Sequence, residues 1–246
     1  KGDRIIDGTN ETLLNLRSKG KKLYFVTNNS TKSRKEYLKK FKSLGLVIDA
    51  EEVLSSSFAA AAYLEKNPLP CDKKVYVIGH QGIGEELDLL GIPHLGGTAD
   101  ADMVADMSSR GKVVHDRDVG AVVVGFDANI NYYKIQYAQL CINENPGCLF
   151  IATNLDAVTH LTSSQQWAGN GAMVGAIKGC TGKDPIVVGK PSSLLADCII
   201  EKCACDPSRI CMVGDRLDTD ILFGIKNGFR TVLTLTGVTS EADLLS

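Results

Sequence analysis

Short apolar runs recur along the whole chain, and segments with helical spacing separate them. A short run rich in β-branched residues is typical of a strand, whereas apolar residues every three or four positions indicate a helix. The predicted strands are Leu23–Val26, Lys73–Gly79, Val119–Val124, Cys148–Ala152, Pro185–Val188, Ile210–Val213 and Thr231–Leu235. This alternation predicts an α/β fold with largely parallel sheets.

The first predicted helix precedes these strands and the others lie between them, and two of the helices have recognisable ends. They are Glu11–Lys19, Ser33–Leu44, Phe58–Leu64, a short helix in GHQGIGEELDLLG (residues 79–91), Tyr132–Asn143, Ser193–Lys202 and Ile221–Lys226. Gly20 and Gly45 follow the first two helices, as expected of residues that end a helix. Ser33 and Glu36 fit a capping box at the start of the second helix.

The composition argues against several classes of function. The 246 residues carry a net charge of -2 and show no basic stripe, so we expect no nucleic-acid partner. No apolar run approaches the roughly 18 residues of a membrane span, so we expect no membrane partner. The eight cysteines suggest no disulfide framework in a chain of this length. Cys203, Cys205 and Cys211 lack the second CxxC or nearby His that a zinc site needs.

The stretch VTNNSTKSR, residues 26–34, places five short polar side chains directly after a predicted strand. The hydroxyl of Thr27, the amide of Asn28 and the backbone N–H groups of the turn can hydrogen-bond phosphate oxygens without adding charge. The alternative is that the hydroxyl residues cap the following helix. We expect both, with capping accounting for the serines and phosphate contact for Thr27 and Asn28.

Lys190 lies in VVGKPS, just past another predicted strand. Pro191 favours a helix start at this point, and a lysine held there is a point charge suited to a phosphoryl group. The alternative is a surface lysine in a turn, which is the ordinary place for this residue type. The glycine before Lys190 and the proline after it favour the functional interpretation.

The stretch GDRLDTDI, residues 214–221, places Asp215, Asp218 and Asp220 at the end of a buried strand. Carboxylate oxygens at this density suit a hard cation such as Mg²⁺. The alternative is an acidic helix start, since Asp is favoured near helix N-termini. An acidic cap needs neither Gly214 nor an apolar strand to position Asp215, so we expect a metal site.

Ligands of parallel sheets bind at the carboxyl ends of strands, and all three polar stretches follow a strand. We therefore expect them to converge on one phosphoryl-transfer site. In this order TNNS, GKPS and GDRLDTD resemble the second, third and fourth motifs of the haloacid dehalogenase-type phosphatases. More narrowly, VTNNSTKSR, VVVGFD, NPGCLFIATN, VVGKPS, MVGDRLDTDILFG and LTGVTS together resemble the phosphoglycolate phosphatases of photosynthetic eukaryotes.

The resemblance extends over the whole chain and implies a Rossmann-like core with a parallel sheet, interrupted by an α/β cap domain of the C2 type. It implies a first core part at residues 1–71, the cap at 72–183 and a second core part at 184–246. It also implies roles for single residues. Substrate contacts are assigned to Thr27, Asn28, Asn29 and His160, phosphoryl charge stabilisation to Lys190, and the Mg²⁺ site to Asp215 and its support Asp220.

The implied activity is Mg²⁺-dependent hydrolysis of 2-phosphoglycolate to glycolate and phosphate through an aspartyl-phosphate intermediate, in photorespiration. A homodimer formed through the cap is implied, in the chloroplast stroma, or in the cytoplasm if the source is not a photosynthetic eukaryote. One alternative is a phosphatase for pyridoxal phosphate or broadly for 4-nitrophenyl phosphate, as in close relatives of this family. Another is a non-catalytic phosphate-binding protein.

Two features depart from the family pattern. The DxDG motif with the aspartate nucleophile is expected immediately before Lys1, so we expect the chain to be truncated at both ends. Leu155 stands in ATNLD where relatives commonly carry Arg.

The glycines at 79, 82 and 84 follow a predicted strand but do not form a dinucleotide-binding motif. Their pattern is GxxGxG rather than GxGxxG, and it predicts only a tight strand-to-helix turn.

Overall fold

The computed structural model of the chain describes residues 5–159, 162 and 164–245. It forms two compact units, the first of which extends to Val187 while the second begins at Val188. Within the described ranges, no helix has the length and apolarity required to cross a membrane. The predicted division into core and cap at 71/72 and 183/184 stays a prediction.

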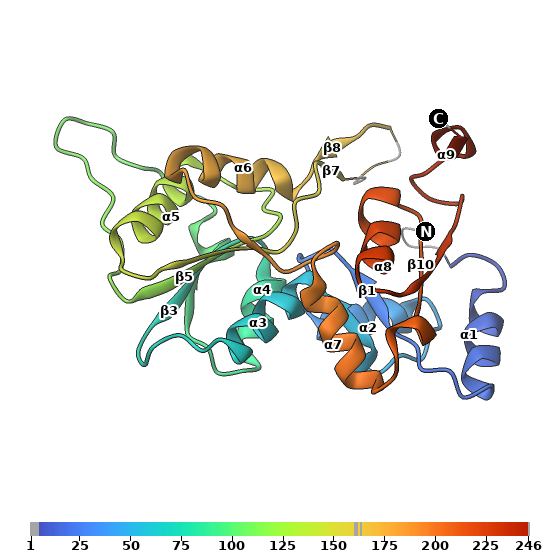
Figure 1. Ribbon diagram of the computed structural model, residues 1–246. Coiled ribbons are helices and arrows are strands. Elements are labelled where there is room, and N and C mark those ends of the chain that lie inside the picture. The colour runs from blue at the N-terminus through green and yellow to red at the C-terminus, as the bar shows by residue number, and fades with distance from the viewer. Residues whose placement is uncertain (1–4, 160–161, 163, 246) are drawn as a thin grey trace. The chain divides into compact units, whose positions relative to one another are not determined.

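The first unit contains a five-stranded sheet in which every neighbouring pair is parallel, in the order β4-β3-β5-β6-β9. Figure 1 shows helices α5 and α6 on one face of this sheet and α3 and α4 on the other. The predicted α/β class is therefore confirmed. The elements are α3 (Ser56–Lys66), β3 (Lys74–Ile78), α4 (Gln81–Asp88), β4 (His94–Gly96), β5 (Val119–Val124), α5 (Tyr132–Glu144), β6 (Leu149–Ala152), α6 (Asn170–Thr181) and β9 (Ile186–Val187).

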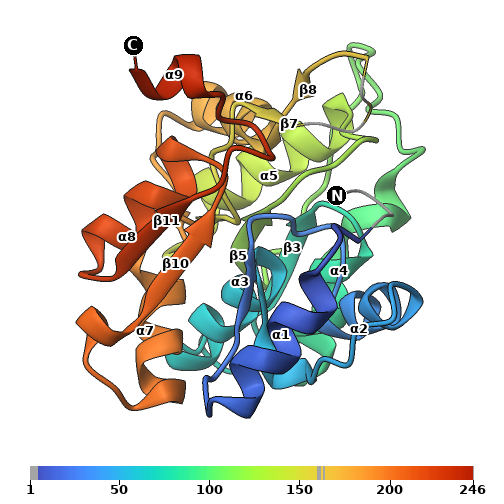
Figure 2. The same cartoon turned by 90° about the vertical axis from the view of Figure 1, so that its right-hand side faces the viewer.

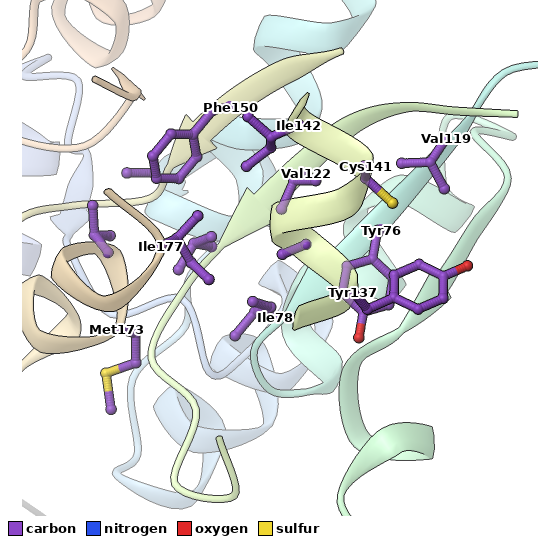
Figure 3. Packing of buried hydrophobic residues seen from close by; sticks show 14 residues of the cluster. Tyr76, Ile78, Val119, Val122, Tyr137, Cys141, Ile142, Phe150, Met173 and Ile177 are labelled. Carbon is purple, nitrogen blue, oxygen red and sulfur yellow. The ribbon is translucent and has the colours of Figure 1, made fainter. Parts of the chain in front are cut away.

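A hydrophobic core joins the sheet to α5 and α6 (Figure 3). Tyr76 of β3 stacks on Tyr137 of α5 with 4.3 Å between ring centroids. The buried Tyr76 hydroxyl donates a hydrogen bond to Asp100 at 2.8 Å, so it retains a partner away from water. Burial of this kind fixes the strands, and with them the loops at their carboxyl ends.

A smaller parallel pair in the same unit carries the first polar stretch. Strand β1 (Phe25–Thr27) pairs with β2 (Val53–Ser55), and helices α1 (Thr9–Ser18) and α2 (Arg34–Ser43) flank it in the chain. Ser33 caps α2 by accepting a hydrogen bond from the backbone N–H of Glu36 at 3.3 Å. The predicted helix start is thus confirmed. A short antiparallel pair, β7 (Val158–Thr159) and β8 (Trp167–Ala168), follows β6 in the chain.

The second unit is built on two parallel strands, β10 (Cys211–Gly214) and β11 (Arg230–Leu233). Figure 2 shows them side by side, with α8 (Leu222–Lys226) next to them. Gly224 allows this close packing, because a Cβ there would lie 2.4 Å from the side chain of Thr231. The remaining elements are α7 (Ser193–Cys203), the 3₁₀ turn Pro207–Arg209, the π-helical turn Leu217–Ile221 and α9 (Glu241–Leu245).

Several elements were not predicted from the sequence, and α6 is the longest of them. Its glycines at 171, 175 and 179 lower intrinsic helix propensity. Gly171 has a packing reason, because a Cβ there would lie 2.9 Å from the backbone oxygen of Leu155. Packing against the sheet thus outweighs the weak local preference. The short strands β2, β4, β7 and β8 also lie outside the predicted set.

Candidate active site

The phosphate loop, residues 27–31, begins where β1 ends. Asn29 is exposed, and its side-chain oxygen accepts hydrogen bonds from the backbone N–H and the hydroxyl of Thr31, at 2.8 and 2.7 Å. A backbone N–H can only donate, so the oxygen of the Asn29 amide faces into the loop and its NH₂ group faces outward. An outward NH₂ group is a neutral donor suited to a phosphate oxygen.

Thr27 is held at the base of this loop. Its hydroxyl oxygen accepts a hydrogen bond from the backbone N–H of Asn29 at 3.2 Å. The Tyr37 hydroxyl donates to the backbone oxygen of Asn29 at 3.4 Å. Burial raises the pKa of Tyr37 to about 12, so this hydroxyl remains a neutral donor at physiological pH. The two predicted contacts Thr27 and Asn29 therefore belong to one hydrogen-bonded turn.

Asn28 and Ser30 alternate with these residues and point inward. Asn28 is 9% exposed and donates from its amide nitrogen to Asp156 at 3.0 Å. The Ser30 hydroxyl is buried and accepts a hydrogen bond from that of Thr153 at 3.3 Å. The loop thus has one side with the half-buried Thr27 and the exposed Asn29, and a buried side anchored on the residues just after β6.

A glycine in the first turn of α4 and another directly after β5 make room for the phosphate loop and the residues after it. A Cβ on Gly82 would lie 2.4 Å from the backbone of Lys32, and one on Gly125 would lie 2.5 Å from the Ser30 hydroxyl. The chain itself therefore fills the space that these glycines leave. The predicted strand-to-helix turn is present, since α4 begins at Gln81, three residues after β3 ends at Ile78.

Helix α4 also fixes the start of α2 through two carboxylates. The buried Glu86 accepts hydrogen bonds from the backbone N–H and the side-chain Nε of Arg34, at 2.5 and 2.9 Å. Glu85 accepts one from the Ser33 hydroxyl. Breaking a buried charge pair is costly. The segment that follows the phosphate loop is therefore held firmly against α4.

In the second unit, Lys190 and Asp220 form a buried ion pair. The Lys190 ammonium lies 2.5 Å from Asp220 Oδ1, and each side chain is only 8% exposed. The other oxygen of Asp220 accepts hydrogen bonds from the backbone N–H groups of Asp215 and Arg216, at 3.1 and 3.2 Å. Both Asp220 oxygens are therefore engaged, and this carboxylate orders the acidic loop, residues 214–220.

Asp215 is held from the other side by the segment after β11. Its Oδ2 accepts a hydrogen bond from the backbone N–H of Val238 at 2.7 Å. A Cβ on Gly237 would lie 1.7 Å from the same oxygen, so only glycine permits this approach. A Cβ on Gly214 would likewise lie 2.4 Å from the Asp220 side chain. Two glycines thus allow the loop to close around its carboxylates.

The remaining predicted positions have different surroundings. Asp218 pairs with Arg216 at 2.7 Å and is 67% exposed, and the hydrogen bonds from this guanidinium lower the pKa of Asp218. His160 lies outside the described residues. Among the side chains that the structure describes, no group of three or more His, Cys, Asp or Glu is placed to hold a metal ion.

The structure therefore brings Lys190, Asp215 and Asp220 together in one unit and the phosphate loop together in the other. Their convergence on one site stays a prediction. Sequence reasoning missed Asp156, although the strand-end pattern that marked the other loops also applies to ATNLD after β6.

Comparisons with known proteins identify the family. The model of the haloacid dehalogenase-like hydrolases matches residues 1–93, and a HAD-hydrolase-like model matches residues 187–246. Phosphoglycolate phosphatase 1A of Arabidopsis thaliana, a chloroplastic protein, is 61% identical over 246 residues, which are 100% of this chain and 68% of the relative. The chain belongs to the haloacid dehalogenase-like phosphatases.

Solved structures of phosphatases share its fold. The p-nitrophenyl phosphatase of Archaeoglobus fulgidus is 31% identical with a TM-score of 0.82, over 99% of this chain and 85% of that one. A glycerol phosphate phosphatase of Mycobacterium tuberculosis, solved in complex with magnesium, is 29% identical with a TM-score of 0.77, over 98% of this chain and 65% of that one. Membership of this family makes the protein a phosphatase, so the expected enzyme is confirmed and the alternative of a non-catalytic phosphate-binding protein is wrong.

Proposed function

We propose that this phosphatase is Mg²⁺-dependent and hydrolyses 2-phosphoglycolate to glycolate and phosphate through an aspartyl-phosphate intermediate. The observation that carries the proposal is the 61% identity to a phosphoglycolate phosphatase over every residue of the chain. We assign the nucleophilic attack to the aspartate of the family's DxDG motif. The described residues then bind the phosphate and stabilise its charge.

The proposed roles follow from the donors that each loop presents. Thr27 and Asn29 contact phosphate oxygens through neutral groups, as does the loop around Asn28. The Lys190 ammonium, held by Asp220, stabilises the charge that develops on the phosphoryl group. A charge that is already fixed in position needs no rearrangement during the reaction, which is why such groups contribute strongly to rate.

The donor set fits Mg²⁺ through Asp215. Mg²⁺ prefers carboxylate oxygens, and Asp215 offers one on a loop whose backbone Asp220 holds in place. Because both oxygens of Asp220 are engaged, we assign Asp220 to supporting the loop and Asp215 to ligating the metal. When bound, Mg²⁺ neutralises phosphate charge and orients the substrate. The relative from Mycobacterium tuberculosis, solved in complex with magnesium, supports the choice of Mg²⁺ as the metal.

The test of substrate is a comparison of kcat/KM for 2-phosphoglycolate, pyridoxal 5′-phosphate, 4-nitrophenyl phosphate and glycerol 3-phosphate in the full-length protein. We expect 2-phosphoglycolate to have the highest value. A higher value for pyridoxal phosphate, or similar values for all four, would support the alternative of a pyridoxal or broad aryl phosphatase. The p-nitrophenyl phosphatase of Archaeoglobus fulgidus supports the broad aryl form of this alternative.

We assign the choice of substrate to the cap, because the core loops are expected to touch only the phosphate. Exchanging residues 73–183 for the cap of a pyridoxal phosphatase is expected to move the preference away from phosphoglycolate. A folded, Mg²⁺-binding chimera that still prefers phosphoglycolate would locate selectivity in the core.

The proposed setting is photorespiration in the chloroplast stroma, with a homodimer formed through residues 72–183. The chloroplastic relative from Arabidopsis supports this compartment. A plastid import assay on the full-length protein and light scattering after gel filtration test the two proposals separately. Retention outside the plastid would contradict the first, and a monomeric mass would contradict the second.

A further inference from the structure

The phosphate loop is anchored at Asn28 by groups that lie far away in the sequence. Its amide nitrogen donates to Asp156 Oδ1 at 3.0 Å. Its backbone oxygen accepts hydrogen bonds from the Ser56 hydroxyl at 2.5 Å and from the Asn154 amide at 2.7 Å. A carbonyl oxygen has two lone pairs, so these two donors match its capacity. Both the side chain and the main chain of Asn28 are therefore held.

The residues that hold Asn28 are locked in turn by the start of α6. The backbone oxygen of Asp156 accepts a hydrogen bond from Gly171 N–H at 2.9 Å, and that of Asn154 accepts one from the Asn170 amide at 2.8 Å. A Cβ on Gly169 would lie 2.1 Å from the Asp156 oxygen. The segment 154–156 is thus pinned between the end of β6 and α6, and its side chains have a rigid base.

The chemistry of these groups decides how the amides are oriented. An ionised carboxylate can only accept hydrogen bonds, so the Asn28 amide must turn its NH₂ group toward Asp156. The Asn154 side-chain oxygen accepts the backbone N–H of Asp156 at 3.0 Å, so its NH₂ group must face the Asn28 carbonyl. Each contact therefore has one permitted orientation.

We infer that Asp156 and Asn154 are positioning residues of the phosphate loop. They act through Asn28 to hold Thr27 and Asn29 in the geometry that receives a phosphate. The inference rests on the proposed role of this loop in phosphate binding. It assigns to Asp156 no contact with the substrate, so its effect is expected to appear only when Asn28 is present.

The first test measures binding of inorganic phosphate to the full-length protein with Mg²⁺ by calorimetry, which requires no turnover. Asp156→Ala is expected to weaken phosphate binding roughly 10- to 100-fold, the range for losing a hydrogen bond to a charged group. Asp156→Asn keeps the size and one acceptor oxygen, so a smaller loss is expected. An unchanged Kd in Asp156→Ala would overturn the inference.

The second test is a double-mutant cycle. If Asp156 acts through Asn28, the loss in Asn28→Ala/Asp156→Ala is smaller than the sum of the single losses. Additive losses would overturn the inference. If Asp156→Ala does not fold, the cycle is run with Asp156→Asn and judged by the same criterion.

The matched control is Asn145→Ala. Asn145 is 4% exposed and donates to the backbone oxygens of Asp116 and Val119, at 3.0 and 2.9 Å. This variant is expected to melt at a lower temperature but to keep its phosphate Kd. Equal weakening of phosphate binding in Asn145→Ala and Asp156→Ala would mean that Asp156 affects binding only through the stability of the fold. That result would overturn its positioning role. None of these measurements depends on which substrate the enzyme prefers. A failure of the phosphoglycolate proposal would therefore appear only in the comparison of kcat/KM values.

Discussion

The phosphate loop and the acidic loop both follow a parallel strand, yet they are held in different ways. Asn28 bonds to Asp156 and Ser30 to Thr153, across 128 and 123 residues of chain. In the acidic loop, Asp220 accepts from the N–H groups of two residues that lie five and four positions earlier. Distant segments hold the first loop, whereas the backbone of the second is ordered by a carboxylate of its own, Asp220.

The two loops therefore depend on different properties: the phosphate loop depends on the geometry of its packing, and the acidic loop depends on its charges. The contacts of Thr27 and Asn29 within the phosphate loop are hydrogen bonds between neutral groups, so their accuracy depends on the packing behind them. The acidic loop carries its own carboxylates and recruits Lys190 as a buried counter-charge. Loss of a charge is therefore expected to matter most in the acidic loop, and loss of packing in the phosphate loop.

Asp215→Asn is expected to have the largest effect, because it removes the proposed metal ligand. Turnover of the full-length enzyme is expected to fall by roughly 1,000-fold, the upper end for losing one preorganised electrostatic group, and the Mg²⁺ concentration needed is expected to rise. Steady-state kinetics across a Mg²⁺ titration measures both. Asp218→Asn is the control on the same loop, since Asp218 is exposed and pairs with Arg216. Normal activity of Asp215→Asn at low Mg²⁺ would refute the assignment.

Lys190→Ala tests the counter-charge. Turnover is expected to fall by about 100-fold or more. Because Asp220 is left buried without its cation, the free energy of unfolding is expected to fall by about 3 to 5 kcal/mol. The control is Lys178→Ala, which removes a lysine from an exposed pair with Asp184. Kinetics and urea denaturation report the two effects, and an unaltered rate would place Lys190 outside the site.

Gly82→Ala tests the packing behind the phosphate loop. The added Cβ meets the backbone of Lys32, so we expect a loss of about 1 to 3 kcal/mol in unfolding free energy together with weaker phosphate binding. Gly175→Ala is the matched helical control, because a Cβ there has no neighbour within 4 Å. That variant is expected to gain about 0.5 to 1 kcal/mol. A Gly82→Ala protein as stable as wild type would show that the backbone at Lys32 can move aside at little cost in free energy.

Asp116→Asn is expected to have the smallest effect, because Asp116 lies before β5, at the opposite edge of the sheet. A hydrogen bond from Lys74 lowers the pKa of Asp116 below its usual 3.8, and a second one from the Asp118 N–H adds a smaller contribution. This carboxylate therefore stabilises the fold above pH 3.8, and the contribution disappears as the pH falls through the lowered pKa.

We expect Asp116→Asn to cost a few tenths of a kcal/mol at pH 7, as is usual for exposed pairs, with turnover unchanged. The stability difference from wild type is expected to vanish in acid, which denaturation at several pH values below 5 measures. A difference that persists at the lowest pH would assign the effect to packing rather than to charge.

Much of the fold was predictable from the sequence, because element type and helix ends depend on neighbouring residues. The predicted strand Val119–Val124 has the same bounds in the structure, and Ser33 caps its helix as expected. The acidic loop was recognisable for the same reason. The Asp220 carboxylate and the two N–H groups that it accepts from lie within five positions of each other, so this part of the motif contains its own geometry.

Tertiary structure alone decided which residues hold the phosphate loop. Asp156 meets Asn28 only because β6 is paired with β5 in one register and α6 packs over that sheet, and neither fact is visible in a local pattern. The same applies to Gly82 and Gly237, whose missing side chains make room for segments far along the chain. Local backbone preferences are set by adjacent side chains, whereas contacts across more than a hundred residues exist only once the sheet and its helices have packed.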